Sequence, residues 1–374
     1  MSEQTYKLNS RLATPEGEYL IQTVNDQKSK RVLSSVFSDG ELLETQDELL
    51  RKGMSSDEVL KRVKEMHEER TRELEYLVGI YKEVVGGEDA KSMVFLGQAL
   101  FYKKMFSESM KLFTQAVTVK PDYHEAWVHL GMVQFKTKEW NDACVSFSKC
   151  VELCPEFADY RNHLGEAYLA LDSCKRAVIE FEEAIKLNVY YGEAYLNLAM
   201  AYILNAIKRE DFKLFSSQTE KTEEMLRKAE VIMPDIVNED YLDGRKYLEN
   251  GDLENAFQKF LHVREIGKDR RRQEFLNSYL KFMLGASKIN EKFLTKQIKS
   301  LKKAISVNPH YADLHHELAV VYTLLGSFIH TKAVEEYKKA LAINPNFRKA
   351  KRNLKLAENE IKGFELLVKA IVRE

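Results

Sequence analysis

The chain has few of the residues that interrupt regular structure. Its 374 residues include only 6 prolines and 16 glycines, while apolar residues make up 44% and charged residues 31%. This composition excludes collagen-like and low-complexity chains, and it favours a mostly helical protein with a hydrophobic core. The length allows two or three ordinary domains or one long solenoid.

Cysteine, net charge and long apolar segments are also scarce. Four cysteines in so long a chain do not build a disulfide framework. A formal net charge of −1 gives no general attraction to nucleic acid or anionic lipid. No run of about 18 apolar residues could cross a membrane, and the first ten residues, MSEQTYKLNS, lack the apolar core of a signal peptide. We therefore expect a cytoplasmic protein with reduced cysteines.

Residues 1–50 have the pattern of a small β module. We expect residues 1–17 to be irregular, because they are polar and end in Thr-Pro-Glu-Gly. Two apolar, β-branched segments, residues 19–24 and 31–37, precede the tight-turn dipeptide Asp39-Gly40 and a third segment. The pattern predicts a three-stranded antiparallel meander, which is too small to be stable without a neighbour.

Residues 51–88 are predicted to form a long connecting helix. Ser55 and Glu58 have the spacing of a capping box at its start, and Gly86-Gly87 would end it. Its apolar residues recur at alternating spacings of three and four, with His67 and Arg70 in the middle. We expect this amphipathic helix to pack on the next helical unit. The alternative is a coiled coil, which would give a homodimer through residues 19–85.

A helical pattern with a longer period begins near residue 90. In residues 124–157, Trp127, Leu130 and Gly131 precede Ala143 and Phe147, and a proline ends the stretch. Small residues at these places let two helices touch, and the proline stops the second helix because it has no amide hydrogen. The same spacing recurs in residues 90–123 and 158–191 and, less regularly, further on. It predicts a series of helix–turn–helix units of about 34 residues.

These motifs resemble those of the tetratricopeptide repeat family. The resemblance implies a right-handed α-solenoid of about seven repeats over residues 89–347, and residues 348–374 would form a capping helix. The fourth repeat carries an insert around residues 206–217 that could lengthen both of its helices or form an exposed apolar loop. The seventh repeat is marked by Leu318, Gly326 and Pro345, among others.

Members of this family bind partner proteins and have no reaction of their own. The resemblance therefore implies a non-catalytic adaptor or scaffold that binds a peptide or an amphipathic helix in its concave groove, with no cofactor and no metal. The first helix of each repeat would line that groove, which we expect to be apolar with an acidic edge. The implied groove residues are Val94, Gln98, Phe101, Val128, Met132, Phe135, Asn162, Glu166, Leu169, Leu196, Met200, Ile203, Tyr241, Arg245, Phe275 and Tyr279.

Other functions have weaker support in the sequence. Basic runs at residues 268–272 and 348–352 allow an RNA-binding helical repeat, but no aromatic residues are interleaved with them. Cys150 and Cys154 lie one helical turn apart, yet Cys150 occupies a small-residue position of the repeat, so burial explains it better than metal binding. No phosphate-binding glycine loop, nucleophile elbow or zinc-protease motif occurs.

Overall fold

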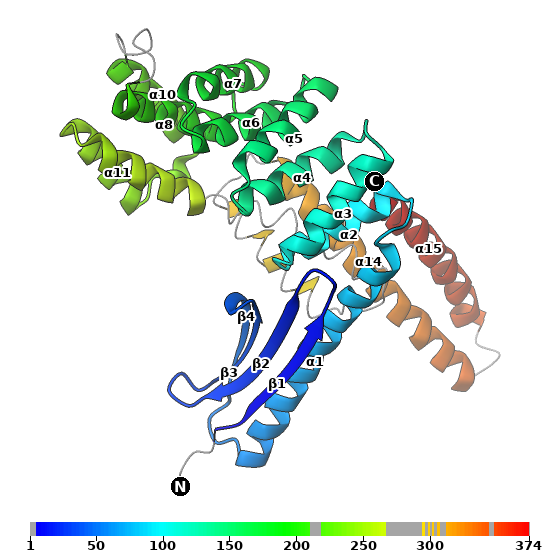
Figure 1. Ribbon diagram of the computed structural model, residues 1–374. Helices are drawn as coiled ribbons and strands as arrows, with labels where there is room; N and C mark the ends of the chain where they lie inside the picture. The colour runs from blue at the N-terminus through cyan, green and yellow to red at the C-terminus, as the bar shows by residue number, and fades with distance from the viewer. Residues whose placement is uncertain are drawn as a thin grey trace. The chain divides into compact units, whose positions relative to one another are not determined.

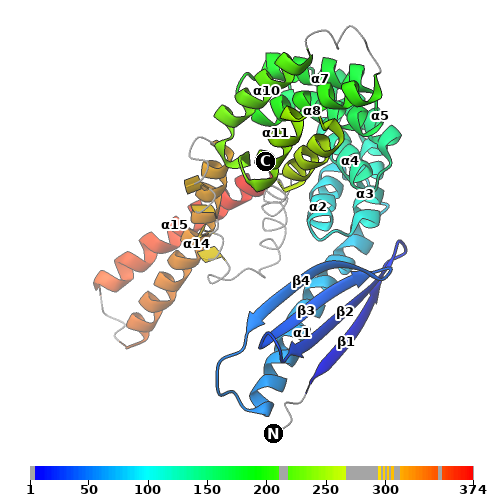
Figure 2. The ribbon, with the colours of Figure 1, turned by 90° about the vertical axis from the view of Figure 1, so that its left-hand side faces the viewer.

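The computed structural model describes residues 5–209, 218–266, 312–343 and 348–373, together with four residue pairs between 294 and 306. The chain forms two compact units, residues 1–279 and 280–374. The first unit holds a β-sheet, a long helix and a series of helical hairpins (Figures 1 and 2). The second unit contains a pair of long helices. Each unit is described by itself.

The N-terminal module consists of a four-stranded antiparallel sheet and helix α1. Strands β1 (Lys7–Ala13), β2 (Glu18–Asp26), β3 (Arg31–Ser38) and β4 (Glu41–Leu49) follow one another in chain order across the sheet. The predicted antiparallel meander is confirmed, but the expectation that residues 1–17 are irregular is wrong. Leu8, Ser10 and Leu12 alternate with polar residues along β1, so one face of this strand can be partly buried while the other stays in water.

Helix α1 (Ser56–Val84) has the predicted start. The hydroxyl of Ser55 accepts a hydrogen bond from the Glu58 amide, and the Glu58 carboxylate accepts one from the Ser55 amide, which completes the capping box. The helix lies along one face of the sheet (Figure 1). Val63 and Met66 pack there against Val32 of β3. The apolar stripe that a coiled coil would need is therefore covered by the chain's own sheet.

Among the described residues of the first unit, five helical hairpins follow, and each pairs its own two helices. Their phase agrees with the predicted repeats. The hairpins are α2 (Ala90–Tyr102) with α3 (Phe106–Val119), α4 (His124–Lys136) with α5 (Trp140–Leu153), α6 (Ala158–Ala170) with α7 (Cys174–Leu187), α8 (Gly192–Lys208) with α10 (Gln218–Ile232), and α11 (Glu239–Glu249) with a helix over residues 253–266; the short 3-10 helix η1 (Pro234–Ile236) precedes α11.

One close contact recurs inside the hairpins. Gly131 of α4 lies against the ring of Phe147 in α5, so that a Cβ atom at this glycine would be only 2.6 Å from the ring. Glycine is therefore required because the two helix backbones approach closely, and not because of its backbone freedom. Gly97 and Gly165 meet Phe113 and Phe181 in the same way.

The turns between the paired helices also share one conformation. Lys104, Lys138 and Asp172 have φ angles of 59°, 66° and 56°, and Gly251 has a φ of 75° at the corresponding place. A single left-handed residue ends the first helix and reverses the chain. In the fourth hairpin α8 has 17 residues where α4 has 13, and the left-handed residue is Arg209. The insert thus lengthens the first helix, and residues 210–217 lie outside the described residues.

The N-terminal module is joined to the first hairpin by buried polar contacts. Glu108 of α3 is fully buried and accepts hydrogen bonds from the hydroxyls of Thr14 and Tyr19, the latter at 2.6 Å. Lys103, which follows α2, contacts Glu73 of α1 at 2.6 Å. Arg70 of α1 is 2% exposed and pairs with Glu73 and with Glu44 of β4. Lys103 and Arg70 neutralise Glu44 and Glu73, and Glu108 is hydrogen-bonded, so these contacts fix the module on the hairpin.

The second unit departs from the predicted seventh repeat. Residues Ala312–Ile343 form one continuous helix of 32 residues, α14, which packs against α15 (Arg348–Arg373). Gly326 lies where the other hairpins place their left-handed turn residue, but here the helix continues through it. The predicted capping helix corresponds to α15. The sixth predicted repeat lies almost entirely outside the described residues.

Candidate functional site

The first helices of successive hairpins contact one another and form a common surface. Helix α4 contacts α2 and α6, and α6 also contacts α8. We call the surface of α2, α4, α6, α8 and α11 the first-helix surface. All of the predicted groove residues belong to these helices except Phe275 and Tyr279, which lie outside the described residues.

The predicted groove residues differ widely in burial. Leu169, Leu196, Met200, Ile203 and Tyr241 are at most 4% exposed, and they belong to one hydrophobic cluster that also contains second-helix residues. These five side chains therefore belong mainly to the hydrophobic core. Val94 and Val128 are also buried, at 4% and 7%.

Partly exposed apolar side chains remain on α2 and α4. Phe101, Met132 and Phe135 are half-buried, and the last two pack against the core cluster of the second and third hairpins. Phe101 makes an edge-to-face contact with Phe106 at a centroid distance of 5.3 Å. These three side chains form the accessible apolar part of the predicted groove.

Hydrogen bonds between polar side chains link neighbouring helices across the same surface. Gln98 of α2 bonds to the Nε2 atom of His129 in α4 at 2.5 Å, and Asn197 of α8 donates to Asn162 of α6 at 3.0 Å. Glu166 accepts from Asn197 at 3.4 Å. Among the described residues, Asn162 Nδ2 and Asn197 Oδ1 have no hydrogen-bond partner.

Burial also sets the charge state of this polar series. Burial, and secondarily the nearby His163, lowers the pKa of His129 to about 3. His129 is therefore neutral at neutral pH, and its ring stacks on Phe113 at a centroid distance of 5.4 Å. Gln98, Asn162 and Glu166 are among the predicted groove residues, but their partners His129 and Asn197 are not. These partners share one repeat position, immediately after the one occupied by Asn162, and that recurrence of polar residues could have revealed them.

Exposed carboxylates border the surface. Glu125 and Asp159 occupy the second position of α4 and α6, and both are exposed. Glu193 occupies the same position in α8 and is half-buried. A carboxylate in the first turn also favours the helix itself, because it faces the positive end of the helix dipole. Arg245 differs from this group, since it pairs with Glu223 at 2.6 Å and Glu230 at 3.0 Å and so links α11 to α10.

The described residues contain no cluster of three or more histidine, cysteine or carboxylate side chains able to hold a metal ion. Cys144, Cys150 and Cys174 are buried free thiols, and burial raises the pKa of Cys144 to about 11. Within the described part of the chain, no helix is both long enough and apolar enough to cross a membrane. Of the predicted basic runs, Lys349, Lys351 and Arg352 are exposed on α15, and residues 268–272 are outside the described residues.

One family model matches part of the chain. A family model described as the tetratricopeptide repeat matches residues 90–123, which include the first hairpin. No curated protein sequence matches the chain. The Gly–Phe contact of this hairpin recurs in the second and third hairpins.

Solved structures with tetratricopeptide repeats resemble about half of the chain. The crystal structure of MamA is 24% identical, with a TM-score of 0.36, over 46% of this chain and 96% of that protein. YrrB, titled a TPR protein with an unusual peptide-binding site, is 16% identical, with a TM-score of 0.37, over 51% and 94%. TTC0263, a thermophilic TPR protein of Thermus thermophilus, is 21% identical, with a TM-score of 0.36, over 51% and 100%.

Proposed function

We propose that this tetratricopeptide-repeat protein is a non-catalytic adaptor that binds a segment of a partner protein along its first-helix surface. The observation that carries the proposal is the half-buried apolar group on α2 and α4, formed by Phe101, Met132 and Phe135 beside an exposed acidic edge. A partner segment with apolar anchors and a few basic residues complements both features.

The apolar group provides the affinity. Each anchor that removes about 100 Å² of apolar surface from water contributes about 2.5 kcal/mol before the cost of ordering the segment. Met132 can adjust to anchors of different shape because its side chain is unbranched. The contact region is centred on the first two hairpins, because the corresponding side chains of α8 are buried in the core cluster.

The acidic edge provides orientation. Glu125 and Asp159 recur at one repeat position, so two exposed carboxylates lie in the first turns of α4 and α6, about two to three helical turns before Met132 and Phe135 on α4. Basic residues at one end of a bound segment would face these carboxylates, and the reversed segment would lose those contacts. Two such adaptors joined through their N-terminal modules, within residues 19–85, would bind two partner segments at once.

A peptide selection tests the proposal. Random phage-displayed peptides are selected on the full chain, and enriched peptides are titrated by fluorescence anisotropy. We expect enriched sequences to combine apolar anchors with lysine or arginine. The double variant Met132→Glu with Phe135→Glu is expected to weaken their binding at least about tenfold, because two charges would be buried against the anchors.

The matched control places the same charges elsewhere. Val145 and Ile179 are 65% and 49% exposed on the second helices α5 and α7. The variant Val145→Glu with Ile179→Glu should bind the selected peptides as the wild type does. Circular dichroism checks that both double variants remain folded. Equal binding by the wild type and the folded Met132→Glu, Phe135→Glu variant would disprove the proposed contact region.

A further inference from the structure

One face of the N-terminal sheet is covered by α1, and the opposite face carries a regular pattern. We call this opposite face the outer face. Strand pairing aligns its side chains in three rows that cross all four strands. In the order β1 to β4 the rows are Arg11, Leu20, Phe37 and Leu42; then Asn9, Gln22, Ser35 and Thr45; then Lys7, Val24, Leu33 and Asp47.

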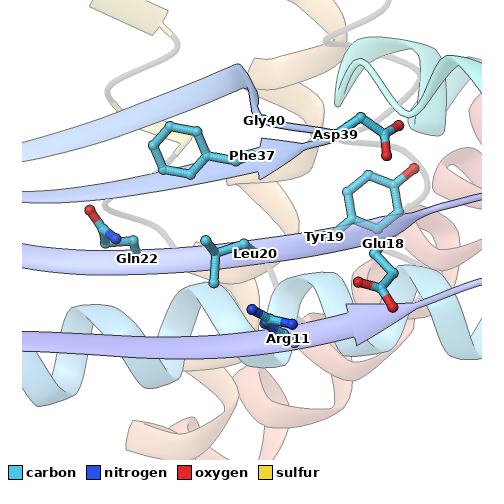
Figure 3. Close-up of a pocket in the computed structure, with 8 residues that line it drawn as sticks. All are labelled: Arg11, Glu18, Tyr19, Leu20, Gln22, Phe37, Asp39 and Gly40. Carbon is cyan, nitrogen blue, oxygen red and sulfur yellow. The ribbon is translucent and has the colours of Figure 1, made fainter.

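The two outer rows have apolar centres. Leu20 and Phe37 are half-buried, and Leu42 beside them is 55% exposed. Val24 and Leu33 form the second apolar centre, and the polar row separates the two. A hollow of about 410 Å³ lies over the first row, where Leu20 and Phe37 project from neighbouring strands (Figure 3).

Charges on this face lie at its rim and nearly balance one another. Three basic residues and four acidic residues surround the apolar centres, and Arg31 pairs with Asp47 within the chain. Lys7, at the opposite edge, makes no ion pair with any described residue. The seven charged residues are Lys7, Arg11, Arg31, Glu18, Asp26, Asp39 and Asp47.

We propose that a second copy of this chain packs on the outer face, with a two-fold axis that runs along the strands between β2 and β3. This rotation places β1 over β4 of the partner subunit and β2 over β3 of the partner subunit. Each row then lies opposite the same row of the partner subunit. Leu20 contacts Phe37 of the partner subunit, and Lys7 lies opposite Asp47 of the partner subunit.

The row pattern favours a second copy over an unrelated partner. A two-fold interface must be complementary to itself, so each group needs its complement on the same surface. The rotation matches apolar with apolar at the centres of two rows and polar with polar in the row between them, and it brings each Lys7 to an unlike charge, while Arg11 lies opposite Leu42 of the partner subunit. Because the rim charges nearly balance, two copies repel each other little.

The size of the face indicates a weak dimer. Four strands about 4.8 Å apart and about 25 Å long cover about 500 Å² on each copy, or about 1,000 Å² in total. This area is at the lower limit of specific interfaces. We expect a dissociation constant on the order of 10–100 μM. The buried contacts of Glu108 and Lys103 hold each sheet and its α1 on its own first hairpin, so the dimer would fix the two hairpins relative to each other.

Analytical ultracentrifugation of the full chain, from about 1 to about 300 μM, tests the surface. We expect a concentration-dependent dimer for the wild type and for the variant Val145→Glu with Ile179→Glu. The variant Leu20→Glu with Phe37→Glu should remain monomeric, with its fold confirmed by circular dichroism. The proposal is overturned if the wild type is monomeric at every concentration. It is also overturned if the folded Leu20→Glu, Phe37→Glu variant dimerises as the wild type does.

Charge reversal tests the direction of the axis. Lys7→Asp places two like-charged contacts in the dimer, and Asp47→Lys does the same with the opposite sign. Each variant alone should dimerise at least about tenfold more weakly than the wild type. An equimolar mixture of the two variants restores both unlike contacts, so it should form a heterodimer close to wild-type affinity. A mixture that stays monomeric where the wild type dimerises would rule out this axis.

Discussion

Substitution of Gly131 tests whether close helix contact holds the repeats together. In Gly131→Ala the new Cβ atom would be 2.6 Å from the Phe147 ring, where an ordinary contact needs more than 3.4 Å. Phe147 is 1% exposed, so its ring can move only by displacing other core side chains. Overpacking of this kind costs about 1–3 kcal/mol. Alanine recovers about 1 kcal/mol of helix propensity, so we expect a net loss of about 1 kcal/mol.

Gly79→Ala is the matched control. Gly79 is an exposed residue inside α1, and a Cβ atom there would meet nothing within 4 Å. Only the gain in helix propensity remains, so this variant should be more stable than the wild type by about 0.5–1 kcal/mol. The two identical substitutions are therefore expected to differ by about 2 kcal/mol and to have opposite signs.

Urea unfolding measures the difference. Both tryptophans of the chain, Trp127 and Trp140, lie in the same hairpin as Gly131, so tryptophan fluorescence reports on that hairpin, and circular dichroism follows α1. A loss of about 1 kcal/mol lowers the urea midpoint by about 0.5 M at an m-value of about 2 kcal/mol/M. A Gly131→Ala midpoint equal to or above that of the wild type would refute the close-contact argument.

Two further changes have definite expected outcomes. Burial opposes ionisation of Glu44, but Lys103 and Arg70 outweigh it and hold the Glu44 pKa below its ordinary value. Its ionised form therefore stabilises the fold above about pH 4.3, and this contribution disappears as the pH falls through the lowered pKa. Glu44→Gln should be less stable than the wild type at pH 7, and the gap in melting temperature should close in acid; a gap independent of pH would contradict this. Lys138 has a φ of 66°, which glycine adopts without strain. Lys138→Gly should therefore raise the free energy of unfolding by about 0.5 kcal/mol and move the urea midpoint upward. A lower midpoint would contradict a left-handed turn at Lys138.

The repeated hairpins could be predicted because their determinants are local and recur. Gly131 and Phe147 lie in one hairpin, and the same pair of residue types returns one repeat later at Gly165 and Phe181. The capping box of Ser55 and Glu58 is equally local. In each case the interacting residues lie close together in the sequence, so their spacing alone carries the information.

Contacts between distant segments could not be predicted in the same way. Glu108 is buried because the hydroxyl of Tyr19, 89 residues earlier, donates to it. Nothing near Glu108 in the sequence distinguishes it from an exposed helix residue. The burial of Leu196 and Met200 in the core cluster depends likewise on the packing of neighbouring hairpins.

Strand β1 and helix α14 were missed for different reasons. The alternation of Leu8, Ser10 and Leu12 was present in the sequence, but the polar composition around it obscured the strand pattern. In α14, Gly326 stands where the other hairpins turn, and the repeat pattern on both sides indicated a turn. A glycine can end a helix in the left-handed conformation, but it can also remain inside one, and its presence alone does not decide between the two.

The adaptor function is tested most directly by the affinity of one selected peptide for three proteins. We predict that the wild type and the Val145→Glu, Ile179→Glu variant bind it equally, and that Met132→Glu with Phe135→Glu binds it at least about tenfold more weakly. The account would be contradicted if all three folded proteins bound the peptide with the same dissociation constant, or if the selection on the wild type enriched no peptide.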